Sequence, residues 1–186
     1  MGPMGQPTRP PLYTAAERAR RDATRWTLVQ GILAPLQFLV FLVSLALVLR
    51  TLATGEGEAA ANLSVVAKTL VLYAIMVTGS IWEKAVFGRY LFAPAFFWED
   101  AVSMLVLALH TAYLAALGLG LLDTAGLMWL ALAAYLAYAA NATQFVLKLR
   151  AARLQVPARP PRAAGIAQGI ARRQGIARRI APEIVR

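Results

Sequence analysis

Residues 80–100 read SIWEKAVFGRYLFAPAFFWED and lie between two apolar segments. This junction and the segment that follows it hold Glu83, Glu99, Asp100 and His110. Ionisable groups at or near membrane depth are costly, and for that reason they usually mark a functional site. The junction therefore indicates a membrane protein and shows where to look for its function.

Apolar segments recur four times along the chain. We predict membrane spans at about 27–49, 63–82, 101–121 and 125–147. Each is close to the ~20 residues that a membrane-spanning helix needs, and short connections favour antiparallel neighbours. We therefore predict an all-α integral membrane four-helix bundle over residues 26–153, with up-down topology. The hydrophobic content of 59% agrees with this class better than with a soluble domain.

The charged residues lie mainly outside these spans. We interpret residues 1–25 as a disordered, basic N-terminal approach, and residues 154–186 as a basic Gly, Ile and Arg tail that is disordered or contacts lipid. The net charge is +10, but basic clusters that flank membrane spans are typical of the cytoplasmic side and of contact with anionic lipid. We expect both termini to be cytoplasmic and no nucleic-acid partner. The chain has no cysteine, which excludes disulfides, thiolate metal sites and cysteine nucleophiles.

The carboxylates of Glu83, Glu99 and Asp100 are expected to lie close together at the edge of the membrane. There they would be partly removed from water and would repel one another. At least one is expected to hold a proton near neutral pH unless Lys84 or Arg89 compensates. A protonated carboxyl group beside an ionised one is the arrangement used for general acid–base catalysis. The alternative is structural, because Glu99 and Asp100 also favour the N-terminus of a helix.

His110 follows Glu99 by eleven residues, about 16 Å along a helix and near the same face. It is either a core histidine that is hydrogen-bonded to a neighbouring helix or a ligand-binding residue. One histidine cannot build a protein metal site, but it can be the axial ligand of a metal that the substrate carries.

Aromatic and amide side chains leave two interpretations open. The aromatic residues of the junction form either an interfacial belt or a surface for a planar ligand: Trp82, Phe87, Tyr90, Phe92, Phe96, Phe97 and Trp98. Polar residues inside the first and fourth spans make either interhelical hydrogen bonds or ligand contacts: Gln30, Gln37, Ser44, Tyr135, Tyr138, Asn141 and Gln144.

Two long motifs resemble one family. GSIWEKAVFGRYLFAPAFFWEDAVSMLVLALHTAYL (79–114) is similar to the core of the 3-vinyl bacteriochlorophyllide hydratases, and WTLVQGILAPLQFLVFLVSLALVLR (26–50) is similar to their first span. The resemblance covers about residues 13–153, and the tail lies outside it. It implies a hydro-lyase of bacteriochlorophyll synthesis in the inner (cytoplasmic or intracytoplasmic photosynthetic) membrane. The enzyme would add water to the C3-vinyl group of 3-vinyl bacteriochlorophyllide a or chlorophyllide a and give a 3-(1-hydroxyethyl) group.

For that reaction we expect Glu83, with Asp100 or Glu99, to be the acid and base. His110 is expected to bind the substrate's Mg or a ring carbonyl, and Lys84 or Arg89 to pair with the pigment's propionate. The residues expected to pack against the ring are Trp82, Tyr90 and Trp98. The reaction needs no cofactor and no metal of the protein's own, because the pigment carries the Mg.

Other functions remain open at this point. The chain is alternatively a non-enzymatic pigment-binding or photosystem assembly protein, in which His110 ligates a chlorin and the carboxylates are structural. A small transporter is a weaker alternative, because the sequence shows no obvious inverted repeat. Beyond the pigment and the lipid bilayer, candidate partners are other enzymes of the pathway or a second copy of the chain.

Overall fold

The structure is a computed structural model that describes residues 12–154. The predictions for residues 1–11 and for the tail from residue 155 onward lie outside the described residues. The chain divides into two units, Met1–Ala152 and Arg153–Arg186, and the description below concerns the first of them.

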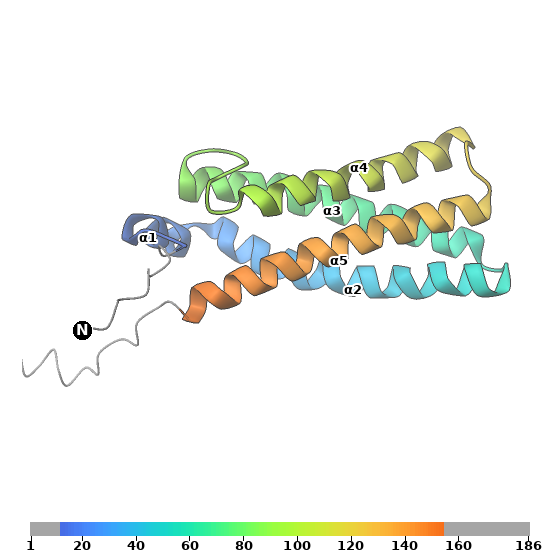
Figure 1. The fold of residues 1–186 in the computed structure, drawn as a ribbon, viewed down its shortest axis with the longest axis horizontal. Helices are drawn as coiled ribbons and strands as arrows, with labels where there is room; N and C mark the ends of the chain where they lie inside the picture. Colours follow the sequence, from blue (N-terminus) through green and yellow to red (C-terminus); the bar gives the residue numbers. More distant parts are fainter. Residues whose placement is uncertain (1–11, 155–186) are drawn as a thin grey trace, which may run out of the picture. The chain divides into compact units, whose positions relative to one another are not determined.

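Four long helices follow one short helix (Figure 1). The short helix α1 spans Ala15–Ala23, and the long helices are α2 (Arg25–Thr54), α3 (Glu58–Phe87), α4 (Phe97–Leu119) and α5 (Thr124–Leu154). Each long helix is long and apolar enough to cross a membrane. Successive long helices run in opposite directions, and residues 12–154 contain no strand. The prediction of an all-α, up-down membrane bundle is confirmed, while the side on which the termini lie stays a prediction.

Three of the long helices extend past the apolar spans read from the sequence. The helices α2 and α3 have 30 residues each and α5 has 31, or about 45 Å of helix. A typical hydrocarbon core is only about 30 Å thick. The apolar pattern therefore marks the lipid-embedded part of each helix, while the helix itself continues into the polar boundary.

The interior and the outer surface of the bundle differ in the usual way for a membrane protein. Fully buried side chains from all four long helices form the core, among them Val48, Val65, Val106 and Met128. Large apolar residues such as Leu39 and Leu136 are exposed on the outside, where hydrocarbon would cover them.

Helix α1 packs against the end of the bundle where α3 ends. Its N-terminus has a capping box between Thr14 and Glu17, and the Arg20 Nε donates a hydrogen bond of 2.7 Å to the Val86 carbonyl. The ring of Tyr13 stacks on that of Phe87 at 5.8 Å between centroids. These contacts fix the end of α3 next to the loop that leads to α4.

Candidate active site

Glu83 and Asp100 meet at the junction between α3 and α4. Glu83 lies in the last two turns of α3 and Asp100 in the first turn of α4. Both side chains are buried, with 4% and 5% exposure, and both carboxyl groups accept hydrogen bonds from the loop that joins the two helices. Two helices of the bundle therefore bring two carboxyl groups, seventeen residues apart in sequence, to one place.

The connecting loop holds both carboxyl groups through adjacent backbone amides. The Phe92 N–H donates to the Asp100 Oδ2 at 2.7 Å, and the Ala93 N–H donates to the Glu83 Oε2 at 3.4 Å. Hydrogen bonds from backbone N–H groups stabilise an ionised carboxyl group. Each carboxyl group thus has a fixed donor, whichever of the two carries the negative charge.

Phe92 adopts a left-handed backbone conformation, with a φ of 57°. It is the only residue other than glycine with a positive φ within residues 12–154. Such a conformation costs on the order of 1–3 kcal/mol and is concentrated at functional sites. Here it accompanies the two amide–carboxyl hydrogen bonds, so the strained turn and the carboxyl pair form one structural unit.

Glu99 has a different partner from the other two carboxylates. Its Oε2 lies 2.5 Å from the Nζ of Lys148 in α5, in a partly buried ion pair. The compensating cation at the junction is therefore Lys148, and not Lys84 or Arg89. The sequence placed Glu99 and Asp100 together as candidates for one role, but the structure separates them: Glu99 is neutralised and Asp100 faces Glu83.

Of the remaining predicted residues of the junction, Trp82 is partly buried and the others are exposed. Trp82 is part of an aromatic cluster, edge-on to Phe87 and Phe96, and its Nε1 donates to the Thr27 hydroxyl at 2.9 Å. The exposed residues are Lys84, Arg89, Tyr90 and Trp98. The Lys84 ammonium donates to the Gly88 carbonyl and lies 5.3 Å from the centroid of the Tyr90 ring.

His110 is completely buried, and only one of its two ring nitrogens has a hydrogen-bond partner among the described residues. Its Nδ1 lies 2.8 Å from the Val106 carbonyl oxygen, which can only accept, so Nδ1 carries the proton. The Nε2 atom is buried without a hydrogen-bond partner in the described part of the chain. A neutral imidazole held in this way presents a free lone pair, the form in which histidine binds metals.

Lys68 of α3 was not among the predicted site residues. Its side chain is fully buried and its Nζ has no hydrogen-bond partner within residues 12–154. The ammonium lies 4.0 Å from the ring centroid of Tyr138 and 5.5 Å from that of Tyr135. The sequence did carry a signal, because Lys68 is the only basic residue in the predicted span 63–82.

The polar residues of the spans make interhelical hydrogen bonds in several places. Gln30 donates to the Thr78 hydroxyl, Asn141 to the Ser103 hydroxyl, and Ser44 bonds the Tyr135 hydroxyl. Gln37 is buried, and neither its amide oxygen nor its nitrogen has a partner among the described residues. Gln144 is exposed.

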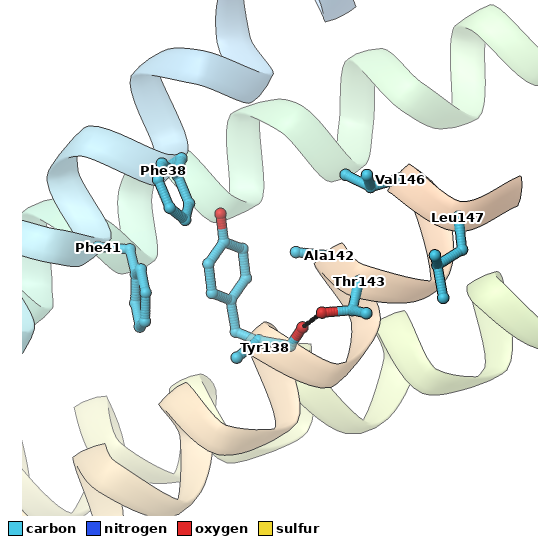
Figure 2. A pocket seen from close by; sticks show the side chains of 8 residues that line it. Phe38, Phe41, Tyr138, Ala142, Thr143, Val146 and Leu147 are labelled. Atoms are coloured by element: carbon cyan, nitrogen blue, oxygen red, sulfur yellow. Dashed lines mark hydrogen bonds between the residues drawn. The ribbon is translucent and has the colours of Figure 1, made fainter. Parts of the chain in front are cut away.

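A pocket of about 280 Å³ lies between α2 and α5. Figure 2 shows the Tyr138 side chain extending from α5 toward Phe38 and Phe41 of α2. The wall residues farther along α5 include Val146 and Leu147, which are largely exposed on the outer face of the bundle. The pocket is therefore open to the lipid side, and the carboxyl pair does not line it.

The region that matches known proteins contains all the residues of this site. Residues 13–151 match the family described as 2-vinyl bacteriochlorophyllide hydratase. A curated protein of that name from Cereibacter sphaeroides is 66% identical, over 82% of this chain and 98% of the relative. Another from Rhodobacter capsulatus is 67% identical, over 80% of this chain and 86% of the relative. No solved structure matches the chain. The names 2-vinyl and 3-vinyl denote the same substituent of the ring.

Proposed function

The chain belongs to the 2-vinyl bacteriochlorophyllide hydratase family, and we propose that Glu83 and Asp100 carry out the hydration. It is a multi-pass membrane enzyme, a hydratase of bacteriochlorophyll synthesis that adds water to the vinyl group of its pigment. We propose 3-vinyl bacteriochlorophyllide a or chlorophyllide a as the substrate and the 3-(1-hydroxyethyl) pigment as the product.

The reaction requires one acid and one base. Protonation of the terminal vinyl carbon leaves a cation on the inner carbon, which the macrocycle delocalises. Water then adds to the inner carbon and loses a proton, so that one water molecule is added in total. A positioned acid delivers the first proton, and a carboxylate stabilises the cation or removes the proton from water.

The placement of the Glu83 and Asp100 carboxyl groups on adjacent backbone amides of one loop is the observation that carries this proposal. Two neighbouring carboxyl groups that are both removed from bulk water do not readily ionise together, because like charges repel. Such a pair shares one proton and titrates as a unit. One member is then the acid and the other the carboxylate, and the proton released by water restores the shared proton at the end of the cycle.

His110 is proposed as the axial ligand of the pigment's Mg. Its free Nε2 fits that role, and it lies ten residues after Asp100 in α4, about 15 Å along the helix axis. Side chains on a helix lean toward its N-terminus, so the imidazole leans toward the Asp100 end. A chlorin lying along α4 would present its vinyl group to the carboxyl pair and its centre to His110.

The exposed residues of the junction are proposed to contact the pigment at the membrane surface. Lys84 or Arg89 would pair with its propionate, and Tyr90 and Trp98 would pack against the ring. The basic residues that flank the spans favour a cytoplasmic location for this end, in the inner or intracytoplasmic membrane. We propose that the protein needs no cofactor of its own.

The test follows the proton and the water separately. Membranes containing the protein are mixed with 3-vinyl chlorophyllide in deuterated water, and in a second experiment in water labelled with heavy oxygen. The expected product gains one water, with one deuterium in the new methyl group and the heavy oxygen on the adjacent carbon. Stable binding of a pigment of unchanged mass would instead favour the non-enzymatic pigment carrier.

A further inference from the structure

Lys68 has a buried side chain, and no carboxylate among residues 12–154 pairs with it. The carboxyl groups of the junction bind elsewhere, since Asp100 and Glu83 accept hydrogen bonds from the loop amides and Glu99 pairs with Lys148. A charged side chain inside a membrane span is expensive, and it is retained where it serves a ligand or a transport path. The Tyr138 ring face offers a cation–π contact, but it leaves the three N–H donors of the ammonium without acceptors.

Lys68 belongs to a group of residues that we term the interior cluster: Lys68, His110, Tyr135 and Tyr138. The rings of His110 and Tyr135 lie 5.9 Å apart, and the Lys68 ammonium lies near the rings of both tyrosines. The Tyr135 ring therefore neighbours both Lys68 and His110. Three helices, α3, α4 and α5, thus bring two unsatisfied polar groups into one completely buried place.

The His110 imidazole and the Lys68 side-chain nitrogen would bind different kinds of ligand atom. The imidazole lone pair of His110 suits a metal, whereas the ammonium of Lys68 can only donate and suits an oxygen acceptor. A Mg chlorin with oxygen atoms on its periphery carries both kinds of atom in one molecule. A protein that merely packed its core would satisfy both groups internally, because nearly all buried polar groups in native structures have a partner.

We propose that Lys68 donates a hydrogen bond to a carbonyl oxygen of the pigment, at the edge of the chlorin that lies farthest from the vinyl group. The inference rests on the proposed function. In this pose the vinyl group lies at Glu83 and Asp100, the Mg at His110, and the oxygen-bearing edge at Lys68. Lys68 and His110 both neighbour the Tyr135 ring, so a pigment whose Mg lies at His110 has one edge close to Lys68.

The pocket between α2 and α5 gives this region a connection to the lipid. Its wall includes Tyr138, and the same ring covers the Lys68 ammonium. A rotation of Tyr138 would therefore join the pocket to the interior cluster. The polar edge of a pigment could then reach Lys68 from the membrane without crossing the junction.

The test compares Lys68→Met with Arg50→Met, at an exposed basic residue near the end of α2, in purified protein in detergent micelles. Chlorophyllide is added, its dissociation constant is measured by absorption, and the stretching frequency of its ring ketone by resonance Raman spectroscopy. A second pigment, in which the free carboxyl group is methyl-esterified, distinguishes a bond to the carboxylate from a bond to the ketone. Thermal unfolding of each variant serves as the control for folding.

We expect Lys68→Met to weaken pigment binding at least tenfold, with a thermal midpoint equal to or above that of the wild type, because methionine removes a buried unpaired charge. A ketone frequency that is low in the wild type and rises in Lys68→Met identifies the ketone as the acceptor. If esterification weakens pigment binding to the wild type but not to Lys68→Met, Lys68 binds the propionate and not the ketone, and the proposal is overturned.

Unchanged affinity and an unchanged ketone frequency in Lys68→Met, with the wild type still hydrating the pigment, would overturn this inference alone. A wild type that binds pigment but does not hydrate it would instead contradict the proposed function. A Lys68→Met variant that unfolds at a lower temperature and binds normally would show that the lysine is structural.

Discussion

The ammonium group of Lys148 lies 2.5 Å from the carboxylate of Glu99, and this ion pair joins α5 to the first turn of α4. The same ammonium lies 5.0 Å from the centroid of the Phe96 ring. Because Glu99 immediately precedes Asp100, the pair removes one negative charge from the surroundings of the carboxyl pair. In the mechanism that we propose, Glu83 and Asp100 then share a proton between themselves.

Replacing Lys148 with Met should therefore leave Glu99 partly buried without its cation. We expect a loss of stability on the order of 1–3 kcal/mol, between the values for exposed and buried ion pairs. The thermal midpoint in detergent measures it. The double variant Lys148→Met/Glu99→Gln should recover most of the loss, since it removes both charges. A double variant no more stable than Lys148→Met would show that the charge pair is not the cause.

The substitutions Glu83→Gln and Asp100→Asn should each lower turnover by about 10²- to 10⁴-fold, the usual contribution of a general acid or base. Each removes a proton-transfer group while keeping the shape of the side chain, so pigment affinity should change little. Single-turnover hydration and a binding titration separate the two effects. Glu56→Gln, at an exposed carboxyl group in the opposite loop, is the matched control. Turnover equal to that of the wild type in both Glu83→Gln and Asp100→Asn would contradict the assignment of these residues as acid and base.

The left-handed turn at Phe92 gives a backbone test of the same site. Phe92→Gly and Phe92→Val both lose the contact with the Phe97 ring, but glycine tolerates a φ of 57° and a β-branched residue does not. We expect Phe92→Val to lower both stability and turnover, and Phe92→Gly to keep turnover close to that of the wild type. Equal losses in the two variants would mean that the aromatic contact, and not the turn, holds the carboxyl groups.

The sequence predicted the fold and the identity of the junction more fully than the contacts within it. Four apolar blocks were enough to predict an up-down bundle, because a membrane leaves a chain few ways to satisfy its backbone. The selection of Glu83, Asp100 and His110 as candidate site residues also rests on the energetic cost of placing polar groups in lipid. Which carboxylates meet depends on the loop, and neither the positive φ of Phe92 nor the directions of its amides can be read from residue types.

The side-chain partners that come from distant segments of the chain also could not be predicted from the sequence. Lys148 looked like a basic flank of the last span, and only the packing of α5 against α4 shows that it neutralises Glu99. Trp82 was predicted to pack against the pigment ring, but its indole donates a hydrogen bond to Thr27 and packs within the aromatic cluster. Lys68 was visible as a lone cation in an apolar span, but its lack of an anion is a property of the folded chain.

The capping box of α1 predicts a pH effect outside the membrane. Hydrogen bonds from the Thr14 backbone N–H and from its hydroxyl hold the pKa of Glu17 below its ordinary value. A lowered pKa stabilises α1 above the ordinary pKa of the group, and the contribution is lost as the pH falls through the folded value. Amide hydrogen exchange in α1 should therefore accelerate in acid. Glu17→Gln should abolish that pH dependence, and a variant that retained it would place the titrating group elsewhere.

His110 provides the sharpest test of how the pigment lies in the bundle. If its free Nε2 binds the central Mg, His110→Ala should weaken the binding of Mg-containing pigment about tenfold or more. The affinity for the same pigment without its Mg should stay unchanged, because the lost bond is to the metal alone. His110→Gln is the second variant, since glutamine keeps a polar group near that position and fills more of the space than alanine. Equal losses for both pigments would assign His110 to packing or to a ring carbonyl, and would require a different pose along α4.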